Sequence, residues 1–94
     1  MAKTFQLNIL TPEKIVYAGS AASLTAPGEA GVLGILADHA PLVTTLSAGK
    51  ISFKDQDGRQ TALESQGKGF LEVFKNEVTV VLSVISKEVN GNLN

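Results

Sequence analysis

Apolar and polar residues alternate along much of this chain, and that alternation constrains the fold more than any other feature. Phe5, Leu7 and Ile9 are separated by single polar residues, and Ile51 and Phe53 repeat the pattern. A period of two is typical of a β-strand with one buried and one solvated face. No segment of ten or more residues shows the spacing of an amphipathic helix. The pattern therefore predicts an all-β fold with little or no helix.

Turn residues divide the alternating segments into short pieces. Asp57-Gly58 is the strongest of these signals, because this dipeptide tolerates the positive φ of a tight hairpin turn. Similar breaks recur roughly every 8–12 residues, the spacing of a sandwich or barrel. With 94 residues, the chain is the size of one domain. We predict an antiparallel β-sandwich of about eight to ten short strands over residues 1–86, and a polar, flexible tail over residues 87–94.

The composition excludes several classes of function. Eight Lys and Arg residues against nine Asp and Glu residues give a net charge of -1, so nucleic acid is not an expected partner. The absence of cysteine removes disulfides, thiolate metal sites and cysteine nucleophiles. The N-terminus lacks the apolar segment of a signal peptide, and no apolar run reaches the roughly 18 residues of a membrane-spanning helix. A role at a membrane would need another protein to hold the chain there.

Residues with catalytic or metal-binding chemistry are few and scattered. His39 is the single histidine, and the adjacent Asp38 would point to the opposite face of a strand, which makes a poor chelate. No serine lies in a Gly-x-Ser-x-Gly elbow. We therefore expect no catalytic, metal-binding or cofactor-binding residue. His39 is interpreted as a turn residue that caps the backbone or contacts a partner.

The glycine-rich segment at residues 28–34 has two interpretations. Its sequence, GEAGVLG, lacks the Gly-x-Gly-x-x-Gly spacing of a dinucleotide-binding loop and precedes a predicted strand. It fits either a bulged connection between strands or a loop that lets another backbone approach closely. The residues alone favour neither interpretation.

Three ordered segments resemble the epsilon subunit of rotary F-type ATP synthases. They are FQLNILTPE at residues 5–13, GVLGILADHAPL at residues 31–42, and GFLEV at residues 69–73 followed by Asn76, Val78, Thr79 and Val80. The second resembles the most specific stretch of that family, Gly-x-Leu-Gly-Ile-x-Pro-x-His-Ala-Pro. The resemblance implies a ten-stranded β-sandwich in the central stalk of a proton-translocating ATP synthase. It also implies a non-catalytic subunit that binds the gamma subunit and the c ring and helps couple ion flow to ATP synthesis.

The same resemblance implies where partners bind. The gamma side would comprise Thr11, Asp38, His39, Ala40 and Pro41. The c-ring side would comprise Gly28, Glu29, Ala30, Gly31, Val32 and Leu33. Thr11 is expected to lie near the turn at residues 38–41. The implied location is the cytoplasmic face of a bacterial plasma membrane, or an organellar energy-transducing membrane, with the isolated chain a monomer.

Several positions depart from the family pattern. Ala37 stands where the family has a proline before the histidine turn, a change that costs up to about 1 kcal/mol through the entropy of the unfolded chain. Val32 replaces an acidic residue of many relatives, and Glu29 could substitute for it. Relatives usually continue into two C-terminal helices that inhibit the enzyme and bind ATP in some members. Nothing after Ile85 is long enough for such a hairpin, so we expect no ATP binding by this chain.

A generic β-sandwich module that binds a protein or a carbohydrate is the alternative. Such a module would present an aromatic-lined face or groove. Aromatic residues make up 5% of the chain and tryptophan is absent. The composition therefore favours the stalk subunit.

Overall fold

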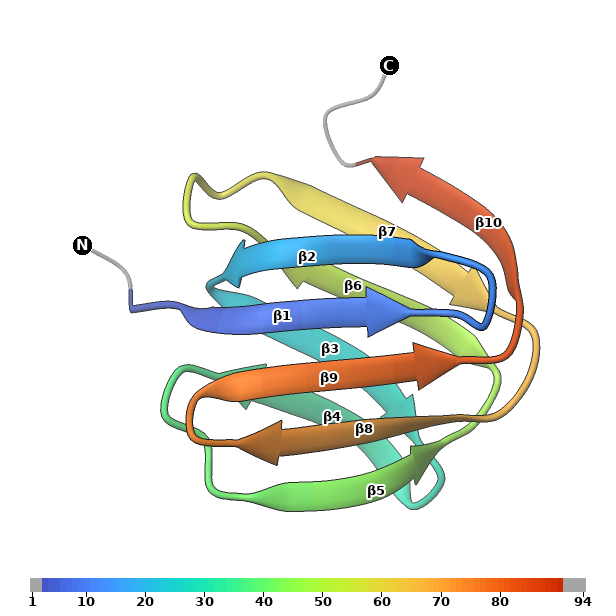
Figure 1. The fold of residues 1–94 in the computed structure, drawn as a ribbon, viewed down its shortest axis with the longest axis horizontal. Helices are drawn as coiled ribbons and strands as arrows, with labels where there is room; N and C mark the ends of the chain where they lie inside the picture. The colour runs from blue at the N-terminus through green and yellow to red at the C-terminus, as the bar shows by residue number, and fades with distance from the viewer. Residues whose placement is uncertain (1–2, 91–94) are drawn as a thin grey trace.

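The computed structural model describes residues 3–90, with the side chains of residues 3–85, and this part of the chain contains strands and no helix (Figure 1). The predicted all-β fold is confirmed. The strands are β1 Phe5–Leu10, β2 Ile15–Ala21, β3 Ser23–Gly28, β4 Gly31–Leu36, β5 Leu42–Leu46, β6 Gly49–Lys54, β7 Gln60–Ser65, β8 Gly69–Phe74, β9 Glu77–Leu82 and β10 Ile85–Asn90.

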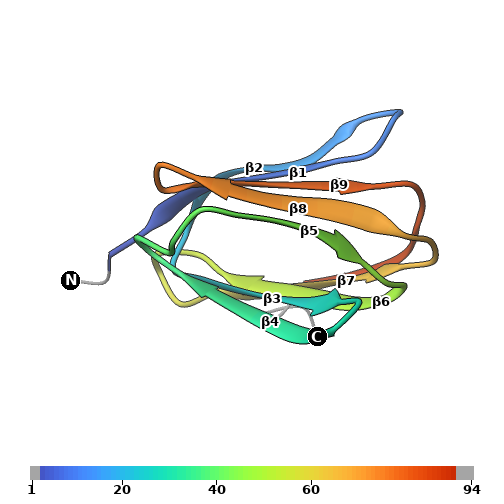
Figure 2. The ribbon, with the colours of Figure 1, turned by 90° about the horizontal axis from the view of Figure 1, so that it is seen from below.

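The strands form two facing layers, so the predicted sandwich is also confirmed (Figure 2). One layer has the order β2-β1-β9-β8-β5, and the other has the order β10-β7-β6-β3-β4. A single register pair, Gly28 with Leu46, joins them through β3 and β5. The prediction of a wholly antiparallel arrangement is wrong for one pair of strands, because β1 pairs with β9 in parallel. The chain places its first strand beside its ninth, a neighbour that no local turn specifies.

The core lies between the layers and follows from the alternation of the sequence. Phe5, Leu7 and Ile9 point inward from β1 with at most 2% of their surface exposed, while the residues between them face outward. Burial of such side chains is the main favourable term in folding. The buried apolar side chains are Phe5, Leu7, Ile9, Ala21, Leu24, Ala26, Ile35, Leu46, Ile51, Phe53, Leu63, Leu71, Val73, Val78, Val80 and Leu82.

Gly19 lies inside a continuous strand. The sequence suggests a bulge at this glycine, yet the register shift of this strand pair falls between Ile9 and Leu10. The Tyr17 hydroxyl donates a hydrogen bond to the Ser20 carbonyl oxygen at 2.7 Å. A Cβ on Gly19 would lie 3.1 Å from that hydroxyl oxygen, so the glycine makes room for the tyrosine side chain.

The last strand occupies part of the expected tail. β10 pairs with β7 antiparallel, from Ile85 opposite Ser65 to Asn90 opposite Thr61. Residues 87–90 therefore form a strand where the sequence predicts a flexible tail. The free edge of β7 offers a ladder of backbone hydrogen-bond partners, and pairing with it requires no apolar alternation. Residues 91–94 lie outside the described residues.

The connections between strands gather at two opposite ends of the sandwich (Figure 1). We call the end near the N-terminus the N end; it holds the connections at residues 22, 37–41, 55–59 and 75–76. The other end, called the far end, holds the connections at residues 11–14, 29–30, 47–48, 66–68 and 83–84. Because successive strands reverse direction, connections that follow odd-numbered strands lie at the far end and those that follow even-numbered strands lie at the N end.

Candidate functional site

The turn between β4 and β5 carries the predicted gamma-side residues Asp38, His39, Ala40 and Pro41 at the N end. Asp38 adopts a positive φ of 64°, an uncommon conformation for a residue with a side chain. His39 is half-buried, and its Nδ1 donates a hydrogen bond to the Ala40 carbonyl oxygen at 2.7 Å. The histidine thus caps a carbonyl of its own turn, one of the two roles considered for it.

The predicted c-ring segment, residues 28–33, is a tight hairpin at the far end. β3 ends at Gly28 and β4 begins at Gly31, so Glu29 and Ala30 alone form the turn. A Cβ on Gly28 would lie 2.7 Å from the Gly31 carbonyl oxygen, which accounts for glycine at this close approach. Val32 is 76% exposed. The β3–β4 pair shows no register shift, so the connection is not bulged, and the close approach at Gly28 is to the backbone of the same hairpin. Close approach by another chain stays a prediction.

Glu29 at the hairpin tip is tied to the neighbouring connections. Its amide donates to the Thr45 carbonyl oxygen at 3.3 Å, and its carboxylate lies 3.3 Å from Lys68 Nζ. A hydrogen bond from the Thr45 side chain, followed by the hydrogen bond and positive charge of Lys68, lowers the pKa of Glu29 below its usual value. Both charged side chains are well exposed, so the pair orients the carboxylate more than it stabilises the fold.

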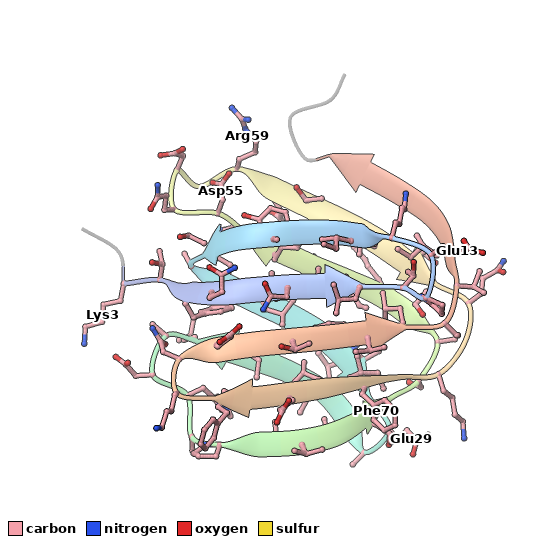
Figure 3. The ribbon with its side chains drawn as sticks, viewed as in Figure 1. Lys3, Glu13, Glu29, Asp55, Arg59 and Phe70 are labelled. Atoms are coloured by element: carbon pink, nitrogen blue, oxygen red, sulfur yellow. The ribbon has the colours of Figure 1, made fainter. Side chains whose placement is uncertain are left out.

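Thr11 lies at the far end and not beside the turn at residues 38–41, so the expected proximity is wrong. Its Oγ1 accepts hydrogen bonds from the Glu13 and Lys14 amides at 3.3 and 3.2 Å and so closes the β1–β2 turn. Lys3, whose Nζ lies 3.4 Å from Asp38, precedes β1, whereas Thr11 follows it. A six-residue strand spans about 20 Å. Figure 3 shows Lys3 at one end and Glu13, from the Thr11 turn, with Glu29 at the other.

An exposed apolar face connects the two ends, and sequence reasoning missed it. On the outer side of β5, β8 and β9, Val43 is 71% exposed, Phe70 57%, Phe74 55% and Val81 39%. Phe70 and Val81 are direct cross-strand neighbours. A shallow hollow of about 360 Å³ adjoins them, lined by Pro12, Thr45, Lys68, Gly69, Phe70, Val81, Leu82 and Ser83. Glu72 lies between Phe70 and Phe74 on the same face, opposite Val43, so the apolar side chains surround one carboxylate. Exposed apolar groups rimmed by polar residues mark interaction surfaces.

The signal for this face was present in the sequence. Phe70 and Phe74 occupy the opposite phase of β8 from Leu71 and Val73, so apolar residues occur on both phases of the strand, with Glu72 between the two phenylalanines. Among the phenylalanines, Phe5 and Phe53 pack in the core, whereas Phe70 and Phe74 do not. A strand that is apolar on both phases but has a single buried side must expose the other.

A second hollow, of about 270 Å³, lies between β2 and the strands β6 and β7 and bears on the carbohydrate-binding alternative. The Tyr17 and Phe53 rings that line it pack against each other with centroids 4.4 Å apart. Phe53 is almost fully buried, and burial, followed by the nearby Asp55 charge, raises the pKa of Tyr17. Rings engaged in this way do not form an open stacking platform for a sugar.

Two classes of site do not occur among the described residues. Among the side chains of residues 3–85, no three His, Asp or Glu groups gather into a possible metal site. The same part of the chain has no helix with the length and apolar character needed to cross a membrane. The candidate surfaces are therefore the two ends and the apolar face between them.

Comparison with known proteins identifies the family of this sandwich. Residues 4–88 match the family described as "ATP synthase, Delta/Epsilon chain, beta-sandwich domain". The ATP synthase epsilon chain of Natranaerobius thermophilus is 49% identical over 79 residues, which cover 84% of this chain and 56% of that protein. The epsilon chain of Desulforamulus reducens is 47% identical over 83 residues, 88% of this chain and 61% of that one. The chain thus spans about three fifths of the length of these relatives.

Solved structures share the fold at lower identity. A chain in the mitochondrial ATP synthase of Euglena gracilis, described as OSCP/F1/c-ring, superposes with a TM-score of 0.81 at 18% identity, covering 97% of this chain and 56% of that chain. A chain in the central stalk and c-ring structure of the Tetrahymena thermophila enzyme gives a TM-score of 0.74 at 14% identity, covering 92% and 68%. The family match and the sequence identities together show that this chain belongs to the β-sandwich domain family of ATP synthase delta and epsilon chains.

Proposed function

We propose that this domain is a non-catalytic rotor component in the central stalk of a proton-translocating ATP synthase. In this role it binds the gamma subunit and the c ring and helps couple ion flow to ATP synthesis. It would be peripheral to an energy-transducing membrane, at the cytoplasmic face of a bacterial plasma membrane, and monomeric in isolation. The family match supports the complex, and the structures from Euglena and Tetrahymena, described as containing the c ring, support the location in the stalk.

One observation carries the assignment of the gamma side: an apolar face runs between the two groups of predicted contact residues. Because Thr11 lies at the far end and residues 38–41 lie at the N end, a gamma subunit that contacts both must lie along the sandwich. The outer face of the layer β2-β1-β9-β8-β5 offers exposed Val43, Phe70 and Val81 along this path. We propose that this face is the gamma-binding surface.

The β3–β4 hairpin suits the proposed contact with the c ring. Its turn has two residues, and the Glu29 amide is bonded to Thr45 of the other layer. The Ser47 amide donates to the Pro27 carbonyl oxygen at 2.8 Å and adds a second link beside the tip. A tip held by backbone hydrogen bonds to β5 and to the β5–β6 connection would transmit torque with little bending.

Substitution of Phe70 by aspartate tests the gamma-binding surface. Phe70→Asp places a charge in the exposed apolar pair of Phe70 and Val81, where a docked gamma subunit would bury it. We expect the affinity for purified gamma subunit to fall at least about thirtyfold, the loss typical of a buried aromatic anchor. Affinity is measured by titration of the isolated domain against immobilised gamma subunit. The melting temperature should change little, because Phe70 is exposed.

Thr25→Asp is the matched control for the gamma-binding surface. Thr25 is exposed on β3, in the other layer, and receives the same new carboxylate. At physiological salt a charge on the far side of a sandwich is largely screened, so affinity should change less than about twofold. Equal weakening by both variants, or by neither, contradicts the proposed gamma surface.

A cross-link from the hairpin tests the c-ring contact. The chain has no cysteine, so Val32→Cys introduces a unique thiol on a side chain that is 76% exposed. In assembled enzyme, a short thiol-directed photo-cross-linker on this residue should join the domain to a c subunit, detected by mass spectrometry. Gln56→Cys, exposed in the β6–β7 turn at the N end, should give no such product. Cross-linking to the c subunit from residue 56 and not from residue 32 would reverse the proposed orientation.

A further inference from the structure

The hairpin between β8 and β9 turns through Lys75 and Asn76. Both residues have a left-handed backbone conformation, with φ of 51° and 61°. Two successive positive φ values belong to a type I′ turn, the usual two-residue connection of a hairpin. Asparagine tolerates this conformation better than most residues. On backbone grounds alone, Asn76 would be a local turn residue equivalent to Lys75.

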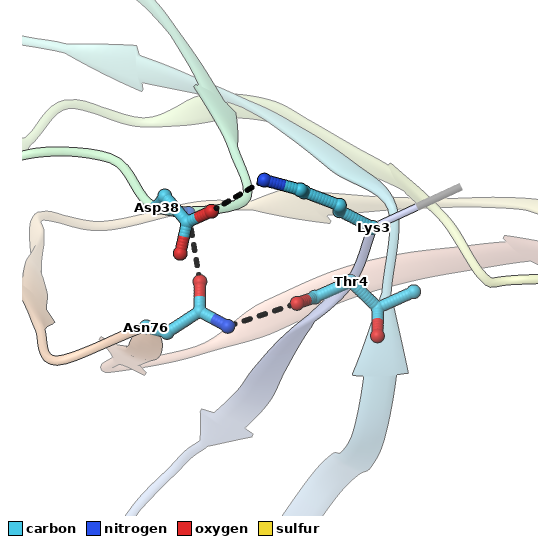
Figure 4. A network of polar contacts seen from close by, with 4 residues as sticks. All are labelled: Lys3, Thr4, Asp38 and Asn76. Carbon is cyan, nitrogen blue, oxygen red and sulfur yellow. Dashed lines mark hydrogen bonds and ion pairs between the residues drawn. The ribbon is translucent and has the colours of Figure 1, made fainter. Parts of the chain in front are cut away.

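The side chain of Asn76 reaches two segments that are distant in the sequence (Figure 4). Its Oδ1 accepts a hydrogen bond from the Asp38 amide at 2.7 Å, and its Nδ2 donates to the Thr4 carbonyl oxygen at 2.9 Å. Its own carbonyl oxygen accepts from the Gln6 amide at 3.1 Å. One residue therefore joins the β8–β9 hairpin, the start of β1 and the turn at residues 37–41.

The contact with Asp38 falls where that turn has its uncommon conformation. Asp38 has a φ of 64°, which needs support from its surroundings. The ion pair between Lys3 and Asp38 is 3.4 Å long and both side chains are mostly exposed, so it gives weak support. Asn76 is half-buried, and its 2.7 Å hydrogen bond is the stronger restraint on the Asp38 backbone.

We propose that Asn76 is a positioning residue that fixes the turn at residues 37–41 in the conformation that binds the partner. This inference rests on the proposed function, in which that turn contacts the gamma subunit. A turn that is ordered before binding does not lose backbone freedom on binding, so its affinity is higher than that of the same residues in a mobile turn. Asn76 itself need not contact the partner.

The chemistry of the side chain is specific for this task. The Asp38 N–H requires an acceptor, and the Thr4 carbonyl oxygen requires a donor. A carboxamide supplies both from one planar group, whereas a carboxylate of the same size would set an oxygen against the Thr4 carbonyl. These two contacts also determine which terminal atom of the Asn76 side-chain amide is the oxygen and which is the nitrogen.

Asn76→Gly and Lys75→Gly form a matched pair of variants for the test. Glycine adopts positive φ readily, so both variants preserve the hairpin turn, and Asn76→Gly keeps the main-chain bond to Gln6 while removing both amide contacts. In Asn76→Gly we expect the Asp38 amide to exchange with solvent about tenfold faster, measured by NMR. The dissociation constant for immobilised gamma subunit should rise about tenfold, as ordering a turn residue costs about 1–2 kcal/mol. Lys75→Gly should change neither quantity by more than about twofold.

Binding is measured well below the melting temperature, so that a loss of overall stability does not reduce the folded fraction. Unchanged Asp38 exchange in Asn76→Gly overturns the inference. Faster exchange with unchanged affinity also overturns it, because ordering the turn then does not assist binding. A third variant, His39→Asp, distinguishes this outcome from a failure of the proposed function. If His39→Asp weakens binding, the turn contacts the gamma subunit but does not need to be positioned by Asn76. If His39→Asp leaves binding unchanged, the turn does not contact the gamma subunit.

Discussion

Leu71→Ala should lower the free energy of unfolding by about 3 kcal/mol, because it removes a fully buried side chain and leaves a cavity between the layers. Leu71 is 0% exposed and lies in β8 between its register partners Thr44 and Val80. For a domain of this size such a loss lowers the melting temperature by roughly 12–24 °C. Urea unfolding followed by circular dichroism measures the change directly, from the shift of the midpoint at constant slope.

Glu72→Ala controls for a general sensitivity of β8. Glu72 is the next residue of the same strand, and its exposed side chain points to the outer face. Its truncation should change stability by no more than about 0.5 kcal/mol. Similar effects of the two substitutions would contradict a core between two layers, since a single exposed sheet would bury neither phase of β8.

Local features of the fold could be predicted because their causes lie within a few residues. The Asp57-Gly58 signal produces the β6–β7 turn, with Gly58 at a φ of 85°. Asp55 Oδ1 accepts hydrogen bonds from the Asp57 and Arg59 amides at 2.9 and 3.0 Å, which closes the turn. Alternation likewise places the inward residues of β1 and β6 in the core. In both cases short-range sterics and burial decide the structure.

Non-local pairing could not be predicted in the same way. The parallel neighbours Gln6 and Glu77 are far apart in the sequence, and no turn or periodicity identifies them as partners. The role of Asn76 could not be predicted for the same reason, because its side-chain partners are distant in the sequence and the local sequence indicates only a hairpin residue. By contrast, the position of Thr11 was predictable. Counting reversals of direction along a β-sandwich assigns the connections after the first and fourth strands to opposite ends.

The candidate surfaces were predicted in part. The segment at residues 28–33 and the turn at residues 38–41 form exposed connections at opposite ends, and their contacts with partners stay predictions. The apolar face between them was missed, because alternation shows that a strand has two faces without showing which face is covered. Phe70 and Leu71 are equally apolar neighbours, and only the position of the second layer decides that Leu71 is buried.

The second large effect is expected at Gly69, the first residue of β8. A Cβ built there would collide with the Val81 carbonyl oxygen and lie 3.0 Å from Leu82 Cδ2. The obstructing atom belongs to the backbone of the paired strand, so relief requires β8 and β9 to separate. We expect Gly69→Ala to destabilise the domain by about 2–3 kcal/mol, the cost of overpacking in a closely packed region. Urea unfolding again provides the measurement.

Gly34→Ala provides a control of opposite sign. Gly34 lies in β4, and a Cβ there would have no heavy atom within 4 Å. Alanine restricts the unfolded chain more than glycine does, so this substitution should stabilise the domain by up to about 1 kcal/mol. Composition and strand propensity predict the same effect on stability for the two substitutions, since each replaces a glycine within a strand by alanine. Opposite signs are expected if β8 and β9 approach as closely as the structure has them. Equal effects would contradict this close pairing, which lies at the edge of the proposed gamma-binding surface.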